Sequence, residues 1–303
     1  MELQTSITTA PSPHKLHHSQ PLLLVGSCFT ESIGAKLSDF GFSTLVNPFG
    51  ILYNPLSIAE CLRRCLAGEE ISEHDLVEHN GLWHSWLHHG SFSAATQEDC
   101  LARCNQVIRE AHAALQQPHT IIVTLGTAYA YFLNDGSLSP ALPVANCHKV
   151  PASRFTKRLL SLQEITTAFD ALDVGSHQLI FTVSPIRHWA DGAHGNQLSK
   201  STLLLAIDQM RQALYFPSYE IMMDELRDYR FYDRDMLHPS PLAVDIIWQK
   251  FQDTFLERET LELGKKHSLL HSMKAHRPLF PESEAYQRHL QKIAELEHEL
   301  NTK

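Results

Sequence analysis

The chain has 303 residues, of which 43% are hydrophobic and 19% charged, enough to bury one large core or two modest ones. The formal net charge of −9 and the lack of any Lys/Arg run argue against a nucleic-acid or anionic-lipid surface. The apolar runs are too short to span a bilayer, and the N-terminus does not resemble a secretory signal. We expect one main domain, no membrane span and a cytoplasmic location.

The six cysteines indicate a reducing compartment rather than a disulfide framework. Two pairs, Cys61/Cys65 and Cys100/Cys104, have the i,i+4 spacing of one helix face. Together they could supply four thiolates to zinc, but structural zinc sites usually use tighter spacings. Free cysteines usually pack as small apolar residues. We therefore predict core packing, with no metal and no other cofactor.

Histidine is abundant, with twenty residues, and this raises a second metal hypothesis. His84 and His88 are four residues apart and could bind zinc if their segment were helical. No HExxH motif or equivalent carboxylate accompanies them. We again predict no metal site.

Apolar runs with the length and flanks of buried strands alternate with helical periodicity along the chain. This alternation predicts a parallel five-stranded sheet covered by helices on both faces. Ligands of such sheets bind beyond the carboxyl ends of the strands. The predicted strands are residues 22–25, 43–46, 120–125, 179–183 and 218–222, and the predicted helices are residues 31–40, 56–66, 98–115, 161–172, 200–214 and 243–255.

Two segments interrupt this alternation. Residues 69–95 are polar and rich in His, with Trp83 and Trp86. We predict an inserted lid or wall whose tryptophans and nearby histidines (His84, His88 and His89) partly face the site. Residues 258–303 form a charged extension to the main domain of residues 1–257, and residues 284–300 are typical of an amphipathic helix. That helix either docks on the domain or forms a homodimer contact.

A nucleophile and a histidine–acid pair stand near opposite ends of the chain. Ser27 and Cys28 follow a buried strand and open a helix, whose first free N–H groups lie beside them. Asp235 precedes His238 by three residues, a spacing that allows the acid to orient the ring. Together they indicate a nucleophile–His–Asp hydrolase. At a helix N-terminus we expect the Cys28 thiolate to be favoured; alternatively Cys28 packs under the helix and Ser27 attacks or caps.

Seven stretches of the chain resemble the GSCFA family, a branch of the SGNH/GDSL hydrolase superfamily. The resemblance implies a flavodoxin-like three-layer α/β/α fold and ester hydrolysis or acyl transfer. The stretches are GSCFTESIGAKL (residues 26–37), NPFGILYNP (47–55), LGTAYAY (125–131), ANCHKVP (145–151), SPIRH (184–188), NQLSKSTLLLA (196–206) and DELRDYRFYDRDMLHPS (224–240).

The resemblance also assigns roles to individual residues. It places Cys28 at the position of the superfamily's serine nucleophile and matches Asp235 and His238 to its last block. It places an oxyanion glycine at Gly50. The third block, normally Gly-x-Asn, appears as Gly126-Thr127-Ala128, so alanine stands where an amide donor is expected. The predicted oxyanion residues are Gly50, Gly126 and Thr127, and the candidate substitutes for the missing amide are Asn47, Asn54, Asn146 and Thr127.

Loops that reach the same edge of the sheet commonly carry binding groups. We predict substrate contacts from Asn47, Asn54, Asn146, His148, Arg187 and His188. The predicted activity is hydrolysis or transfer of an O-acyl group of a small molecule or carbohydrate through a covalent acyl-enzyme. Two alternatives stay open: a non-catalytic binding protein, suggested by Ala128, and an enzyme that uses Cys28 for other thiol chemistry.

Overall fold

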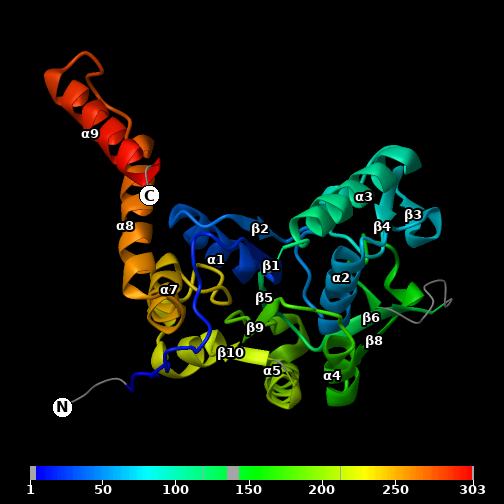
Figure 1. Cartoon of the computed structure of the whole chain (residues 1–303). Helices are drawn as coiled ribbons and strands as arrows, with labels where there is room; N and C mark the ends of the chain where they lie inside the picture. The colour runs from blue at the N-terminus through cyan, green and yellow to red at the C-terminus, as the bar shows by residue number, and fades with distance from the viewer. Residues whose placement is uncertain (1–4, 118, 135–142, 212, 302–303) are drawn as a thin grey trace.

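A parallel five-stranded sheet forms the centre of the molecule in the computed structural model, which describes residues 5–117, 119–134, 143–211 and 213–301 (Figure 1). The strand order is β10-β9-β5-β1-β2, and every neighbouring pair is parallel. The predicted α/β class with a five-stranded parallel sheet is thereby confirmed. The strands are β1 (Leu22–Gly26), β2 (Thr44–Val46), β5 (Thr120–Leu125), β9 (Gln178–Val183) and β10 (Ala213–Phe216).

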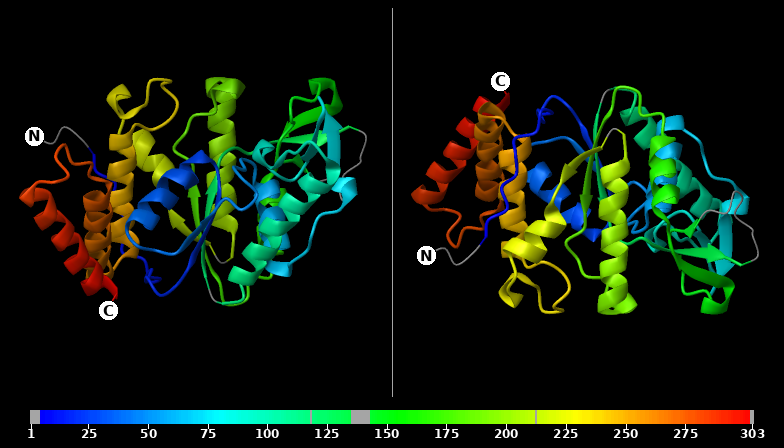
Figure 2. Two further views of the ribbon diagram at one scale, coloured as in Figure 1. Left: turned by 90° about the horizontal axis from the view of Figure 1, so that it is seen from above. Right: turned by 90° about the horizontal axis from the view of Figure 1, so that it is seen from below.

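Helices cover both faces of the sheet, giving three layers (Figure 2). Because successive strand residues point to opposite faces, Leu22 and Leu24 pack in one core cluster while Leu23 and Val25 pack in the other. The first cluster lies under α1 (Cys28–Asp39) and α7 (Pro241–Phe255), and the second under α2 (Pro55–Ala67), α3 (Gln97–Ala114), α4 (Leu162–Asp170) and α5 (Gly192–Gln209).

The fifth strand lies earlier than predicted. Helix α5 ends at Gln209, and β10 occupies residues 213–216, the first two of which were expected to be helical. Residues 218–222 are helical instead, in α6 (Ser218–Glu220) and the π-helical turn η5 (Ile221–Glu225). Ile221 and Met222 are fully buried, so the apolar run here reflects a helical segment packed in the core and not a strand. A short apolar run does not by itself distinguish a strand from a buried helix.

A second, antiparallel sheet, which was not predicted, follows the segment Gly126-Thr127-Ala128. It has the order β7-β6-β8, with β6 at Tyr129–Leu133, β7 at Pro143–Val144 and β8 at Phe155–Leu159. Its strands leave from the carboxyl end of β5. They therefore build a wall at the edge of the main sheet where a ligand is expected.

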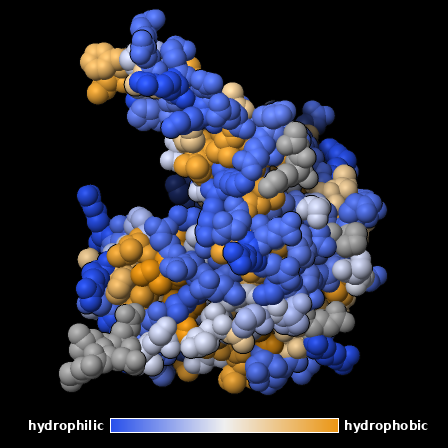
Figure 3. All heavy atoms as spheres, turned by 60° about the vertical axis from the view of Figure 1, so that its left-hand side comes forward, coloured by the Kyte–Doolittle hydropathy of each residue, from blue (hydrophilic) through white to orange (hydrophobic). Residues whose placement is uncertain are grey.

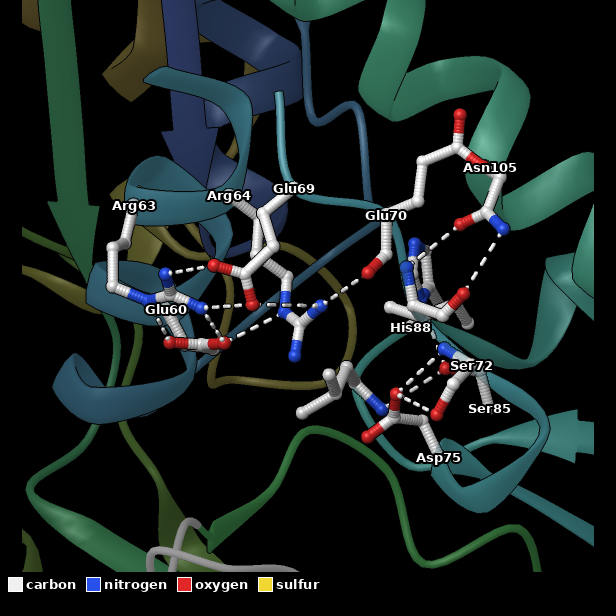
Figure 4. A network of polar contacts seen from close by, with 12 residues as sticks. Glu60, Arg63, Arg64, Glu69, Glu70, Ser72, Asp75, Ser85, His88 and Asn105 are labelled. Carbon is white, nitrogen blue, oxygen red and sulfur yellow. Dashed lines mark hydrogen bonds and ion pairs between the residues drawn. The ribbon is translucent and has the colours of Figure 1, made fainter. Parts of the chain in front are cut away.

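The inserted residues 69–95 form a hairpin, β3 (Leu76–His79) and β4 (Leu82–Ser85), between two short 3₁₀ turns, η1 (Glu73–Asp75) and η2 (Gly90–Phe92). Polar contacts fasten the insertion to α2 and α3 (Figure 4). Asn105 of α3 pairs with both backbone groups of Ile71, at 2.8 and 3.1 Å. Arg64 of α2 bonds the Glu70 carbonyl at 2.9 Å and Glu60 at 2.6 Å. The insertion is thus part of the α2–α3 layer.

The C-terminal extension is a hairpin of two helices, α8 (Arg258–Ala275) and α9 (Glu284–Asn301), that projects from the α/β body (Figure 1). Gly264 of α8 packs against the ring of Phe40, so α8 is the helix that contacts the body. Ion pairs Lys266–Glu299 and Lys274–Glu297 join α9 to α8. The amphipathic helix therefore docks on its neighbouring helix. None of the described helices has the length and apolar character to span a membrane.

Candidate active site

A tight crossing of backbones at the end of β1 positions the nucleophile candidates. Gly26 has φ +140°, and a Cβ there would lie 2.1 Å from the Thr124 carbonyl oxygen of β5, so only glycine fits. Its N–H donates to Asn47 Oδ1 at 2.9 Å, which fixes the turn. Ser27 is the N-cap of α1, and Cys28 is the first helical residue. The predicted strand–turn–helix placement of Cys28 is confirmed.

Cys28, His238 and Asp235 form a continuous chain of contacts, as the sequence predicted. Cys28 Sγ lies 3.6 Å from His238 Nε2, and His238 Nδ1 lies 2.5 Å from Asp235 Oδ2. The other oxygen of Asp235 accepts the N–H groups of Leu237 and His238, both at 2.9 Å. These two N–H groups, together with the His238 ring, lower the pKa of Asp235 to about 2. The carboxylate is therefore ionised at neutral pH and holds Nδ1, which leaves Nε2 facing the thiol.

The electrostatic state of Cys28 differs from the expectation. Burial raises the pKa of the Cys28 thiol above its ordinary value, and nearby Glu31 adds to this effect. The N–H groups of Cys28 and Phe29, and the ammonium of Lys200, oppose the rise without cancelling it. The predicted preference for a thiolate is thus wrong for the resting protein. The thiol is protonated at neutral pH and needs His238 to take its proton.

Ser27 does not contact the histidine. Its side chain is 1% exposed, and its hydroxyl has no hydrogen-bond partner among the described residues. It makes no side-chain cap for α1 either. Ser27 also lines the cavity, but of the two adjacent candidates it is Cys28 that the geometry joins to the His238–Asp235 pair.

A cavity of about 590 Å³ opens in front of Cys28 and His238. Several residues that line this cavity were not predicted as site residues. They come from the loop before α2, from the antiparallel sheet and from the turn η4 (Trp189–Asp191). The lining residues that the sequence did not predict include Tyr53, Tyr129, Tyr131, Lys157, Trp189 and Asp191. Lys157 lies over the rings of Tyr129 and Tyr131 and pairs with Asp191.

Four of the predicted binding residues line this cavity and two do not. Asn54, Asn146, Arg187 and His188 line it, whereas Asn47 and His148 are buried outside the lining. Asn47 serves the Gly26 turn described above. His148 stacks on His84 with ring centroids 4.6 Å apart, and its Nε2 bonds the Ser85 carbonyl at 2.7 Å. His148 therefore supports the insertion rather than a substrate.

Two of the lining asparagines are also engaged in local structure. Asn54 caps α2, with its oxygen accepting Ser57 N–H and its amide donating to Ser57 Oγ, both at 2.9 Å. Among the described residues Asn146 uses only its oxygen, which accepts the N–H of His148 at 2.9 Å. Of these two substitutes for the missing amide, Asn146 has the less engaged donor.

The three predicted oxyanion residues donate their N–H groups elsewhere. Gly50 N–H donates to the Asn47 carbonyl at 2.7 Å, and the N–H groups of Gly126 and Thr127 both donate to the Tyr53 carbonyl at 2.9 and 3.0 Å. The prediction that they bind an oxyanion is wrong in this geometry. Gly50 has a packing role instead, because a Cβ there would meet His89 Cβ at 2.3 Å. The first-turn N–H groups of α1, beside Cys28 Sγ, are the remaining backbone donors.

The insertion reaches the cavity through His89, as expected for one of its histidines, but His84 and His88 do not line the cavity. Neither Trp83 nor Trp86 is among the lining residues. Trp83 packs in the α2–α5 core, and Trp86 is 3% exposed in a small cluster of its own. The expected contact of these tryptophans with the cleft is therefore wrong. Trp86 supports the cavity lining indirectly, because its carbonyl accepts the N–H of cavity-lining Ala145 at 2.7 Å.

Arg187 fastens the loop that carries Asp235 and His238 to the end of β9. Its N–H donates to the Leu237 carbonyl at 3.3 Å, and its guanidinium donates to the Met236 carbonyl. The same guanidinium lies over the ring of Tyr232, 4.6 Å from the centroid. Met236 has φ +61°, an uncommon conformation for a residue with a side chain, so these contacts hold an unusual turn between Asp235 and His238.

The described residues contain no cluster of three or more His, Cys, Asp or Glu side chains able to hold a metal ion. Cys61, Cys65, Cys100 and Cys104 are all fully buried in the core beneath α2 and α3. His84 belongs to strand β4, and the ring of His88 stacks on Phe49 with centroids 4.0 Å apart.

Fold and site together define the class: an α/β/α protein with a thiol, an imidazole and a carboxylate aligned at the carboxyl edge of its parallel sheet. Residues 21–251 match the GSCFA family, and the chain therefore belongs to that family. No match was found among curated proteins, and none among solved structures.

Proposed function

We propose that this protein is an SGNH-like hydrolase or acyltransferase that cleaves an ester through an acyl-enzyme on Cys28. One observation carries the proposal: the contact chain from Cys28 Sγ through His238, at 3.6 Å, to Asp235, at 2.5 Å, at the floor of a cavity. This is the geometric signature of a nucleophile, a base and an orienting acid. The link to the SGNH/GDSL superfamily adds an analogy of motifs and fold.

The proposed reaction has two halves. Cys28 Sγ attacks the acyl carbonyl carbon while His238 Nε2 accepts the thiol proton, giving a tetrahedral oxyanion. The C–O bond then breaks, and His238 returns the proton to the leaving alcohol, which leaves a thioester on Cys28. Water, or an acceptor alcohol in a transferase, attacks the thioester with His238 again as the base, and the thiol is regenerated. Asp235 remains ionised and keeps the ring oriented throughout.

Charge on the oxyanion falls beside the first turn of α1. The N–H of Cys28 is one of the four donors that a helix leaves unpaired at its start, and it lies next to the thiol. The side-chain amide of Asn146 is a second donor on the cavity wall. Each donor of this kind contributes about 10²–10³ in rate.

The substrate we propose is an O-acylated small molecule or carbohydrate. Aromatic side chains beside polar ones suit a ligand with both apolar and hydroxylated faces, and Tyr53, Tyr131 and Trp189 are each more than a third exposed on the cavity. A cytoplasmic location fits the six cysteines, all of which are free. No nucleic-acid or membrane partner is part of the proposal.

An activated-ester probe followed by intact-mass measurement tests the proposal. We expect one acyl adduct on the wild-type chain, mapped to the peptide with Cys28, and none on Cys28→Ala. Hydroxylamine should remove the adduct, because it is a thioester. An inert wild-type chain would contradict the proposal.

A non-catalytic binding protein is the second candidate. It is favoured by Ala128, which replaces the expected amide, and by the engaged N–H groups of Gly126 and Thr127. The same probe separates the two functions, since a binding protein would keep the cavity but form no adduct. Oxidation or thiol adducts at Cys28 without acylation would instead favour an enzyme of thiol chemistry.

A further inference from the structure

A lysine is fully buried beneath the catalytic edge. Lys200 of α5 is 0% exposed, and its Nζ donates to the carbonyls of Gly126 and Ser184, both at 2.8 Å. These two carbonyls directly follow the ends of β5 and β9. One side chain thus joins the two loops that carry Thr127 and His188 to the cavity.

The surroundings of Lys200 offer its charge no carboxylate. Among the described residues, no carboxylate oxygen lies within 4.0 Å of its Nζ, and its third side is the ring of Tyr219, 5.3 Å away at the centroid. The ionisable groups near it are Cys28 on α1, His188 after β9 and Tyr219 on α6. A buried charge without an ionic partner is costly unless it serves one that forms transiently.

We propose that Lys200 is a positioning residue whose buried ammonium stabilises negative charge forming at Cys28, in place of the amide that is absent at Ala128. Stabilisation of a substrate oxyanion by Lys200 rests on the proposed function, whereas stabilisation of the Cys28 thiolate does not. Nearby positive charge favours an anion, and it acts more strongly in a site shielded from water. Because its Nζ is held by the Gly126 carbonyl, the charge lies at the end of β5, two residues before Ala128 in the chain.

The electrostatic couplings agree with this geometry. Burial lowers the pKa of Lys200 to about 7, and a Cys28 thiolate would raise it again. In the other direction Lys200 lowers the pKa of the Cys28 thiol. Burial lowers the pKa of His188 to about 4, and Lys200 adds to this effect, so His188 is neutral and does not compete for the anion. Stabilisation of negative charge at Cys28 by the Lys200 ammonium should therefore be present below about pH 7 and be lost above it.

Alkylation of Cys28 by iodoacetamide measures the effect without any substrate. In the wild type we expect the alkylation rate to rise less than tenfold per pH unit between about pH 6 and 8, because the ammonium deprotonates as the thiolate forms. Lys200→Gln keeps an amide donor for the carbonyls but has no charge. It should alkylate about tenfold more slowly at pH 6 and equally fast at pH 9. Cys147, half-buried elsewhere on the cavity, is the internal control.

A second measurement covers the outcome in which Lys200 variants fail to fold. Titration of [¹³C]lysine by NMR in Cys28→Asp, which places an anion at the nucleophile, should raise the pKa of Lys200 by about one unit. Cys28→Ala should leave it unchanged. Equal Lys200 titration in both chains, or parallel alkylation profiles for wild type and Lys200→Gln, would overturn the proposal. Neither readout needs ester turnover, so its result is independent of whether the chain is an esterase.

Discussion

At the residue scale, Cys28 and Ser27 are chemically similar neighbours that the fold separates. Cys28 Sγ lies against His238 at the start of the helix, while the Ser27 side chain is 1% exposed at the cavity wall and makes no hydrogen bond among the described residues. We predict that Ser27→Ala retains most probe labelling at Cys28, measured by intact mass. The variant should also be as stable as the wild type or slightly more stable, because it removes a buried hydroxyl without a partner. Loss of labelling in Ser27→Ala with retention in Cys28→Ala would assign the nucleophile to Ser27.

The His238–Asp235 pair makes a graded prediction. His238→Ala should lower turnover of an activated ester by several orders of magnitude, since His238 is the one base that contacts the thiol in the part of the chain that the structure describes. Asp235→Asn should cost less, because it removes orientation and charge but leaves the base. Since the pKa of Asp235 is about 2, its ionisation should not appear in the pH–rate profile above pH 4. The rates are measured under single-turnover conditions. A wild-type rate in either variant would contradict a triad of Cys28, His238 and Asp235.

Motif spacing predicted residues whose role depends on side-chain placement, and failed where the role depends on backbone orientation. Cys28 and the His238–Asp235 pair meet because β1 ends beside the loop that precedes α7. Gly50, Gly126 and Thr127 lie where expected in the chain, but their N–H groups are used by Asn47 and Tyr53. Such local hydrogen bonds set the direction of a single peptide plane, which cannot be predicted from the residue types.

At the scale of elements, regular periodicity made the main sheet and its helices predictable, while short strands were not. The antiparallel sheet carries a visible signal in hindsight: Tyr129 and Tyr131 alternate with the buried Ala130 along β6, and the pairing places Lys157 opposite Tyr131. Only the five residues of β6 carry that pattern, and its partner β7 has two residues. Segments this short do not show in the sequence which strands pair with each other.

The insertion between α2 and α3 predicts an acid-sensitive stability. Burial lowers the pKa of His88 to about 3, so the folded protein keeps this ring neutral while the unfolded chain protonates it below about pH 6.5. The stabilisation is therefore complete above pH 6.5 and is lost as the pH falls toward 3. Between pH 7 and 4.5 this one group should lower the free energy of unfolding by about 2 kcal/mol.

Urea unfolding at the two pH values measures this loss. His88→Gln does not titrate and should show a smaller difference between pH 7 and 4.5 than the wild type. His74→Gln, an exposed histidine of the same insertion, is the matched control and should keep the wild-type difference. Identical pH dependence in the wild type and His88→Gln would show that His88 is not the acid-sensitive group.

The loop that carries the catalytic pair depends on Arg187. We predict that Arg187→Met lowers the rate of Cys28 acylation ten- to a hundredfold, because Met236 and Leu237 lose their tether and the His238 ring loses its position. Arg187→Lys should rescue little, since a lysine cannot keep both the ring stacking and the carbonyl bond. Arg230→Met, which removes an exposed arginine paired with Asp228, should leave the rate unchanged. Stopped-flow acylation with the activated ester would distinguish these variants.

At the scale of the whole molecule, the helical hairpin of α8 and α9 stands apart from the catalytic body. Its apolar stripe predicted either docking or dimerisation, and Ile293, Leu296 and Leu300 are in fact half-covered within the hairpin. Apolar side chains remain uncovered at its tip (Figure 3). Leu279 is 89% exposed and Phe280 75% exposed in the turn between the two helices. Large apolar side chains gathered on a projecting element are typical of a contact with another chain.

We therefore predict that the protein forms a homodimer through this hairpin, with Leu279 and Phe280 at the contact. Light scattering coupled to gel filtration should give twice the chain mass of 34.3 kDa for the wild type and the single mass for the double variant Leu279→Ser/Phe280→Ser. Acylation of Cys28 should be equal in both, because the tip does not line the cavity. Leu205→Ser, an exposed leucine of α5 on the body, is the control and should remain dimeric. A single-chain mass for the wild type at micromolar concentration would leave the hairpin without a role in self-association.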